Sequence, residues 1–256
     1  MRRRDVLTAA GTGAIAALAG CTGALGSVAP PAVPTQRLES GGWEQQSERQ
    51  ETVFEQSYGP VTVQAKAHSL VYSDVALRKD IAEKTLGRVD GRMAIFSATR
   101  VQFSPNLADL PGDIGTDQIV SQTADAAREQ FRTEMTDAGL QDVEAVGTGT
   151  VEIDTGESAE TTQYEATFPF SDVEFPVTDD QTITIEGEPL TVEGILAVWS
   201  HEGSVLVAGG AYPAENVDKT VTEQLSSAIT VSVDIDLGLD PAALREEMLS
   251  LITAVK

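Results

Sequence analysis

Alternating apolar and polar positions recur along the middle of the chain and predict β-strands. Between residues 60 and 72, Val61, Val63 and Ala65 alternate with polar side chains, which is typical of a half-buried strand. Similar runs predict further strands over residues 92–103, 143–153, 161–170, 182–186, 191–200 and 204–212. The glycines in the short turns 186–188 and 201–203 predict a positive φ, and strands joined so closely are antiparallel. Gly209-Gly210 predicts an irregularity or bulge in the last strand.

Apolar residues at spacings of three and four predict helices elsewhere. The clearest stripe runs over residues 117–138 and ends at Gly139, and a shorter helix over residues 75–86 begins after Asp74. Two helices are predicted to close the chain. The second begins at Pro241, with Asp240 as its N-terminal cap. The first carries the stripe Val217, Val221, Leu225 and Ala228.

This order of elements predicts an α+β fold. Consecutive strands with helices between and after them favour a mainly antiparallel sheet of about seven or eight strands, with three or four helices packed largely on one face. One globular domain over residues 51–256 accounts for all of these elements.

The first twenty residues have the pattern of a cleaved signal peptide. Three arginines precede a weakly apolar run over residues 6–19, which is too short to span a bilayer. Arg3 and Arg4 resemble a twin-arginine export signal. Leu18, Ala19, Gly20 and Cys21 resemble the lipobox at which a lipoprotein is cut and lipidated. We therefore expect a lipid on Cys21 that holds the protein on the outer face of the cytoplasmic membrane; an ordinary signal peptide that contains a cysteine is the alternative.

Cys21 is the single cysteine of the chain. If it is lipidated, a disulfide framework, a cysteine nucleophile and a thiolate metal site are excluded from the mature domain. Residues 21–50 are rich in proline at first and then in polar residues, which predicts a flexible tether. At about 3 Å per residue, such a tether reaches up to roughly 90 Å.

The charge of the chain indicates the kind of organism it comes from and disfavours one class of partner. The 17 Lys and Arg residues stand against 40 Asp and Glu residues, for a net charge of −23. So much self-repulsion in a folded domain is relieved when salt near 1 M shortens the screening length to roughly 3 Å, which favours a halophilic source. An acidic surface protein from a dilute medium is the alternative. Nucleic-acid binding is disfavoured, because no basic stripe is present.

Candidate chemistry is sparse. His68, on the polar face of a predicted strand, and His201, at a predicted hairpin tip, have no catalytic partners at a fixed spacing. Asp234 and Asp236 are weak candidates for a hard-cation site, and Asp240 is a helix cap. We therefore predict no catalytic residue, no cofactor and no dedicated metal site.

With these motifs in view, the chain resembles haloarchaeal twin-arginine-exported lipoproteins grouped as a domain of unknown function. The resemblance rests on Arg3-Arg4, on Leu18 to Cys21, on Gly42-Trp43 and on residues 205–213. It implies a location and a source, and it assigns no catalytic residues.

These observations leave three functions open. The first is a non-enzymatic binding or interaction module, favoured if an apolar groove lies between sheet and helices or if Trp199 or Phe175 lies in an exposed patch. The second is a structural or spacing element of the cell envelope. The third is a hydrolase, which would need a histidine in a pocket beside a carboxylate and a hydroxyl. We expect a monomer whose protein or small-molecule partner the sequence does not identify.

Overall fold

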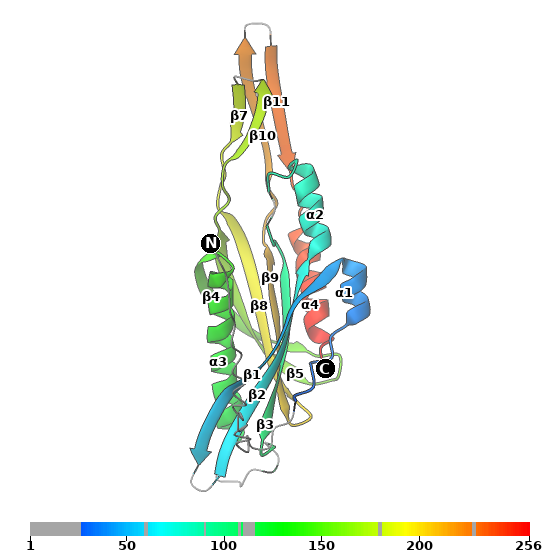
Figure 1. Ribbon diagram of the computed structural model, residues 1–256, viewed down its shortest axis with the longest axis vertical. Helices are drawn as coiled ribbons and strands as arrows, with labels where there is room; N and C mark the ends of the chain where they lie inside the picture. Colours follow the sequence, from blue (N-terminus) through cyan, green and yellow to red (C-terminus); the bar gives the residue numbers. More distant parts are fainter. Residues whose placement is uncertain are drawn as a thin grey trace, which may run out of the picture.

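A computed structural model describes residues 27–256, except 59–60, 90, 107–108, 110–115, 179–180 and 227–228. Within these residues the fold is α+β and mainly sheet, as predicted. Its centre is a seven-stranded antiparallel sheet in the order β1-β2-β3-β9-β8-β5-β4, and two small two-stranded sheets, β6-β7 and β10-β11, lie beyond it (Figure 1). Four helices accompany these sheets in the described part of the chain.

The described part of the chain contains eleven strands, divided among the three sheets, and four helices. The large sheet contains β1 (Trp43–Tyr58), β2 (Val61–Asp74), β3 (Ile95–Ser104), β4 (Gln141–Glu152), β5 (Ser158–Phe168), β8 (Leu190–His201) and β9 (Ser204–Pro213). The small sheets contain β6 (Val173–Thr178), β7 (Gln181–Ile185), β10 (Asp218–Ser226) and β11 (Ile229–Asp236). The helices are α1 (Thr35–Gly41), α2 (Val75–Lys84), α3 (Thr116–Asp137) and α4 (Pro241–Thr253).

Two apolar cores lie on opposite faces of the large sheet, because its central strands are buried on both sides. Along β8, Ile195, Ala197 and Trp199 face α1 and α4, whereas Leu196 and Val198 face α3. In Figure 1, α1, α2 and α4 lie on one side of the sheet and α3 on the other, so the helices lie largely on one face.

The two small sheets extend the molecule along its longest axis and form what we call the arm (Figure 1). A third apolar cluster fills the base of the arm. Ile81 of α2 packs there with Ile185 of β7 and Ile235 of β11, all of them buried. A two-stranded hairpin is marginal by itself in water, and this cluster supplies the packing that it lacks.

The predicted helix over residues 217–228 is wrong, since Asp218–Ser226 forms β10 and pairs with β11. Val217 and Val221 are four residues apart, and that spacing satisfies the period of a strand as well as that of a helix. Threonine and valine are frequent in this segment, and β-branched residues favour strands.

The predicted tether over residues 21–50 extends too far along the chain. Residues 35–41 form α1, and β1 begins at Trp43 and pairs with β2 along its length. Val28 is 2% exposed, and Ala32 and Lys256 exchange backbone hydrogen bonds of 2.6 and 2.9 Å. The domain therefore includes residues 27–50, and the polar side chains of residues 44–50 belong to an edge strand.

Other local predictions are confirmed. Asp74 accepts a hydrogen bond of 2.8 Å from the backbone amide of Leu77, and Asp240 caps α4 ahead of Pro241. Gly139 has a positive φ of 95° just beyond α3. No helix in the described residues combines the length and apolarity needed to cross a membrane.

Two of the glycine predictions are wrong. Gly203 has a positive φ in a β8–β9 hairpin, as predicted, but Gly187 does not, and β7 and β8 belong to different sheets. Gly209 and Gly210 continue β9 without a bulge. A Cβ on Gly210 would lie 2.3 Å from the backbone oxygen of Ile95, so the glycines here provide space for close neighbours.

Candidate binding groove

A groove lies between α3 and one half of the large sheet. On the face of the sheet that α3 covers, the helix lies closest to β8, β9 and β4. It therefore leaves β1, β2 and β3 less covered on that face. Two adjoining hollows of about 350 and 420 Å³ occupy this space. Because they share Glu51, Ser69, Ser97, Gln130, Phe131 and Glu134, they form one continuous groove.

Small side chains make the floor of the groove. Ala67 and Ser69 of β2 lie beside Ser97 and Thr99 of β3, and the Thr99 hydroxyl donates a hydrogen bond of 2.8 Å to the Ser69 hydroxyl. The register places Arg49 opposite Ser69 and Ser69 opposite Thr99. The floor therefore offers hydroxyl groups at positions where larger side chains would fill the space.

Helix α3 forms the facing wall. Gln130 and Glu134 line both hollows and are exposed, whereas Phe131 is 6% exposed and its ring lies 5.2 Å from that of Tyr164. Successive helical turns bring these side chains to one face, because they are three and four residues apart. The wall thus combines an apolar base with polar side chains above it.

Charges of both signs line the groove. Arg49 and Arg92 line the larger hollow together with Glu51, Glu134 and Asp137. Neither arginine forms an ion pair within the described residues, whereas Arg128 and Arg245 do. Two guanidinium groups without a carboxylate partner therefore lie in one hollow of a chain whose net charge is −23.

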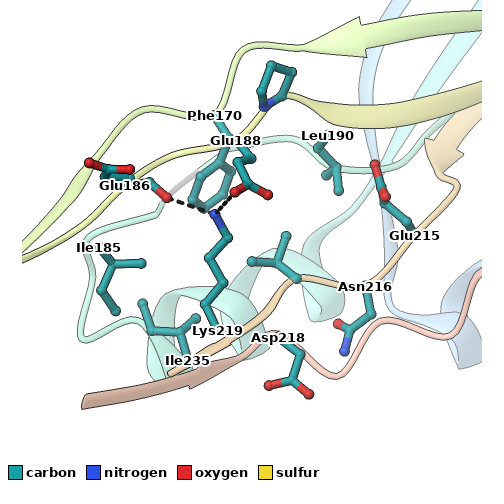
Figure 2. Close-up of a pocket in the computed structure, with 12 residues that line it drawn as sticks. Phe170, Ile185, Glu186, Glu188, Leu190, Glu215, Asn216, Asp218, Lys219 and Ile235 are labelled. Atoms are coloured by element: carbon teal, nitrogen blue, oxygen red, sulfur yellow. Dashed lines mark hydrogen bonds and ion pairs between the residues drawn. The ribbon is translucent and has the colours of Figure 1, made fainter. Parts of the chain in front are cut away.

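A second cavity lies at the base of the arm, and the charged Lys219 that lines it is paired with a carboxylate of the same cavity. Figure 2 shows Lys219 extending between Glu186 and Glu188 above Ile185 and Ile235. The Lys219 Nζ lies 2.9 Å from the Glu186 carbonyl oxygen and 3.0 Å from a Glu188 carboxylate oxygen. This cavity of about 130 Å³ is smaller than either hollow of the groove, and its ion pair joins β10 to the segment before β8.

His68 is buried, on the face of β2 opposite the groove. Its Nε2 lies 2.8 Å from a Glu48 carboxylate oxygen, and its Nδ1 lies 2.8 Å from the Val28 carbonyl oxygen. The Gln50 amide nitrogen also lies 3.1 Å from Nδ1, so both ring nitrogens have polar partners. His68 therefore fastens the start of the described chain to the edge of the sheet.

His201 is at the tip of the β8–β9 hairpin, as the sequence predicts, and it has a carboxylate partner from the β4–β5 turn. Its Nδ1 lies 2.6 Å from Glu157, whose other oxygen accepts a hydrogen bond from the Thr155 hydroxyl. Two hydrogen bonds lower the pKa of Glu157 to about 2, and the bond from the Thr155 hydroxyl has a larger effect than the bond from His201. The hydroxyl contacts the carboxylate rather than the imidazole, which is not the order of a catalytic triad.

Asp234 and Asp236 both lie on β11. Asp236 accepts hydrogen bonds of 2.8 Å from the Asn216 side chain and from the Gly238 backbone, and the Asn216 bond is the main cause of the lowered pKa of Asp236. In the described part of the chain, no group of three or more potential metal ligands comes together. Asp236 thus stabilises the turn into α4.

The two aromatic side chains considered for an exposed patch lie elsewhere. Trp199 is 3% exposed within the core that faces α4, and Phe175 is partly buried at the base of the arm. The groove itself contains none of the residues that the sequence suggested for chemistry. Residues 44–52 are all polar, so they carry no period-two signal that could have placed β1 beside the groove.

Comparison with known proteins gives one match. The family model described as Domain of unknown function (DUF6517) matches residues 30–256. The chain belongs to this family. No curated protein and no solved structure matches it. The match begins ahead of α1, which agrees with a DUF6517 domain that includes β1.

The export and lipidation motifs fall outside the described residues. Arg3, Arg4, Leu18, Ala19, Gly20 and Cys21 all precede residue 27. The haloarchaeal source, the twin-arginine route and the lipid remain predictions from sequence, while membership of a family of unknown function is confirmed.

Proposed function

We propose that this DUF6517 protein is a lipid-anchored surface module that binds a ligand in the groove under α3. The observation that carries this proposal is the groove itself, whose two hollows of about 350 and 420 Å³ are in the size range of small-molecule sites. Its lining contains hydroxyl, amide, carboxylate and guanidinium groups around one aromatic ring. None of its described lining residues is a histidine, which favours binding over histidine-dependent hydrolysis.

The location rests on the lipobox and on Cys21. Val28 is seven positions after Cys21, so at about 3.5 Å per residue the buried part of the domain begins within about 25 Å of the lipid. In Figure 1 the described chain begins in the half of the molecule opposite the arm. The proposal therefore holds the domain close to the outer face of the membrane.

Halophilic adaptation and twin-arginine export complete the proposal. Apart from Arg2, Arg3, Arg4 and Asp5, the charges behind the net −23 of the chain lie in residues 27–256, a packed domain whose cores lie on both faces of one sheet. Such a domain tolerates its own surface charge best in concentrated salt. Export of an already folded chain through Arg3 and Arg4 is compatible with folding in a salty cytoplasm.

Binding in the groove is tested by nuclear magnetic resonance on the full chain carrying Cys21→Ser, in molar salt, with a library of polar organic fragments. We expect shift changes to gather at Ser69, Ser97 and Gln130. The Ala126→Trp variant should abolish them, because Ala126 lines the smaller hollow. The control is Thr136→Trp, at an exposed position of α3 that lies outside the lining of either hollow and on the side of the helix away from the groove.

Shift changes scattered over the surface, or unaltered in Ala126→Trp, would contradict a binding role for the groove. A spacing element of the envelope is the alternative that this result would favour. That alternative draws on the elongated shape seen in Figure 1, with the arm at one end.

A further inference from the structure

We infer that the groove accommodates an oligosaccharide, an inference that rests on the proposed function and specifies its ligand. The first reason is length. Thr123 lines one end of the groove and Asp137 the other, and both lie on α3. At 1.5 Å per helical residue these ends are about 21 Å apart, which suits a chain of several units better than a single compact molecule.

The second reason is how an occupant can form hydrogen bonds. Strands β2 and β3 pair with neighbours on both sides, so the floor of the groove offers few free backbone groups. An extended peptide in this position would leave its own amides to be satisfied by side chains alone, at a cost for each unsatisfied group. A sugar chain needs no backbone partner, because its hydroxyl groups bond to side chains.

The third reason is the set of side chains. Ser69, Ser97 and Thr99 on the floor are both donors and acceptors, and Gln130 on the wall adds an amide. Glu51 and Glu134 accept hydrogen bonds from hydroxyl groups, while the uncommitted Arg49 donates to ring oxygens or to acidic substituents. This mixture matches the paired donors and acceptors of a polyhydroxylated chain.

The fourth reason is the apolar part of the same lining. Phe131 lies between the polar groups and lines both hollows, with Ala67 and Val101 in the floor of one of them. The carbon-bound faces of sugar rings are weakly apolar and pack on such surfaces. Small floor residues leave room for the width of a ring.

The test is calorimetric titration of four tetrasaccharides into the full chain carrying Cys21→Ser in molar salt: cellotetraose, chitotetraose, mannotetraose and tetragalacturonate. We expect saturable one-to-one binding of at least one of them, and binding of its monosaccharide at least ten-fold weaker, because one ring contacts only part of the groove. Ala126→Trp should abolish the binding, while the matched Thr136→Trp leaves it unchanged.

A milder variant keeps the test independent of folding. Gln130→Ala removes one exposed amide from the wall and should weaken binding by about five- to ten-fold, the effect of one hydrogen bond. If no tetrasaccharide binds while fragments still perturb Ser69 and Ser97, the oligosaccharide inference is wrong and the groove remains a binding site. If a neutral octapeptide of alternating glycine and serine binds instead, the ligand is a peptide and the inference is overturned.

Discussion

Removal of residues 1–50 should unfold the domain, because α1 and β1 belong to it. Leu38 of α1 is 2% exposed and Trp43 of β1 is 5% exposed, both in the core that faces α4. The Trp43 indole also donates a hydrogen bond of 2.9 Å to Glu247 of α4. A chain that starts at residue 51 lacks Leu38 and Trp43, and it uncovers the part of β2 that pairs with residues 43–50.

The cost can be worked from those two side chains. Burial of a leucine contributes about 1.5–3 kcal/mol. Loss of a buried tryptophan costs about 3–5 kcal/mol. Together they reach roughly 5–8 kcal/mol, a large part of the free energy of unfolding of a typical domain, which is about 5–15 kcal/mol.

The assay is urea unfolding in molar salt, followed by circular dichroism, on three chains: the full chain carrying Cys21→Ser, a chain that starts at residue 27 and a chain that starts at residue 51. We expect the first two to unfold at the same urea concentration, since both retain Val28 and its contact with His68. The third should show no cooperative transition. An equal midpoint for the chain that starts at residue 51 would refute the assignment of β1 to the domain.

Three further predictions concern β9, the β4–β5 turn and the surface. Gly210→Ala should lower the free energy of unfolding by about 1–3 kcal/mol, because the added Cβ would meet backbone atoms. Gly147→Ala is the control and should cost under about 0.5 kcal/mol, because its Cβ would meet only a movable side chain. Equal effects of the two substitutions in urea unfolding would contradict this. The Glu157 carboxyl should titrate near pH 2 by carbon nuclear magnetic resonance, and Thr155→Ala should raise that midpoint. The stability that the ionised Glu157 contributes is present above the unfolded pKa of about 4.3 and is lost as the pH falls toward 2. A midpoint already near 4.3 in the unaltered chain would rule out the contact. The thermal midpoint of the full chain carrying Cys21→Ser should rise between dilute buffer and molar salt, and an unchanged midpoint would remove the argument for a halophile.

Several elements could be predicted from the sequence because their local signals agree with the tertiary structure. Helix α3 has a long stripe at helical spacing that ends at Gly139, and α4 has a capping aspartate followed by Pro241. The β8–β9 hairpin has Glu202 and Gly203 in the positive-φ conformation that its short turn requires. Helices α3 and α4 each have one apolar face, and the strands of the hairpin are buried on both faces.

Other elements could not be predicted, for physical reasons. Strand β1 lies at the edge of the sheet and most of its side chains are exposed, so its polar sequence looks like a linker. In β10, the spacing of Val217 and Val221 fits both periods. The groove depends on the offset of α3 toward β8 and β9, and small residues such as Ser69 and Ser97 carry no sequence signal of that offset.

The most direct test of the central claim, a lipid-anchored surface protein, is the intact mass of the protein recovered from the membranes of its native host. We predict a species that lacks residues 1–20 and carries added lipid mass on Cys21. A full-length, unmodified species in the soluble fraction would contradict the claim, and it would leave Cys21 as a free thiol.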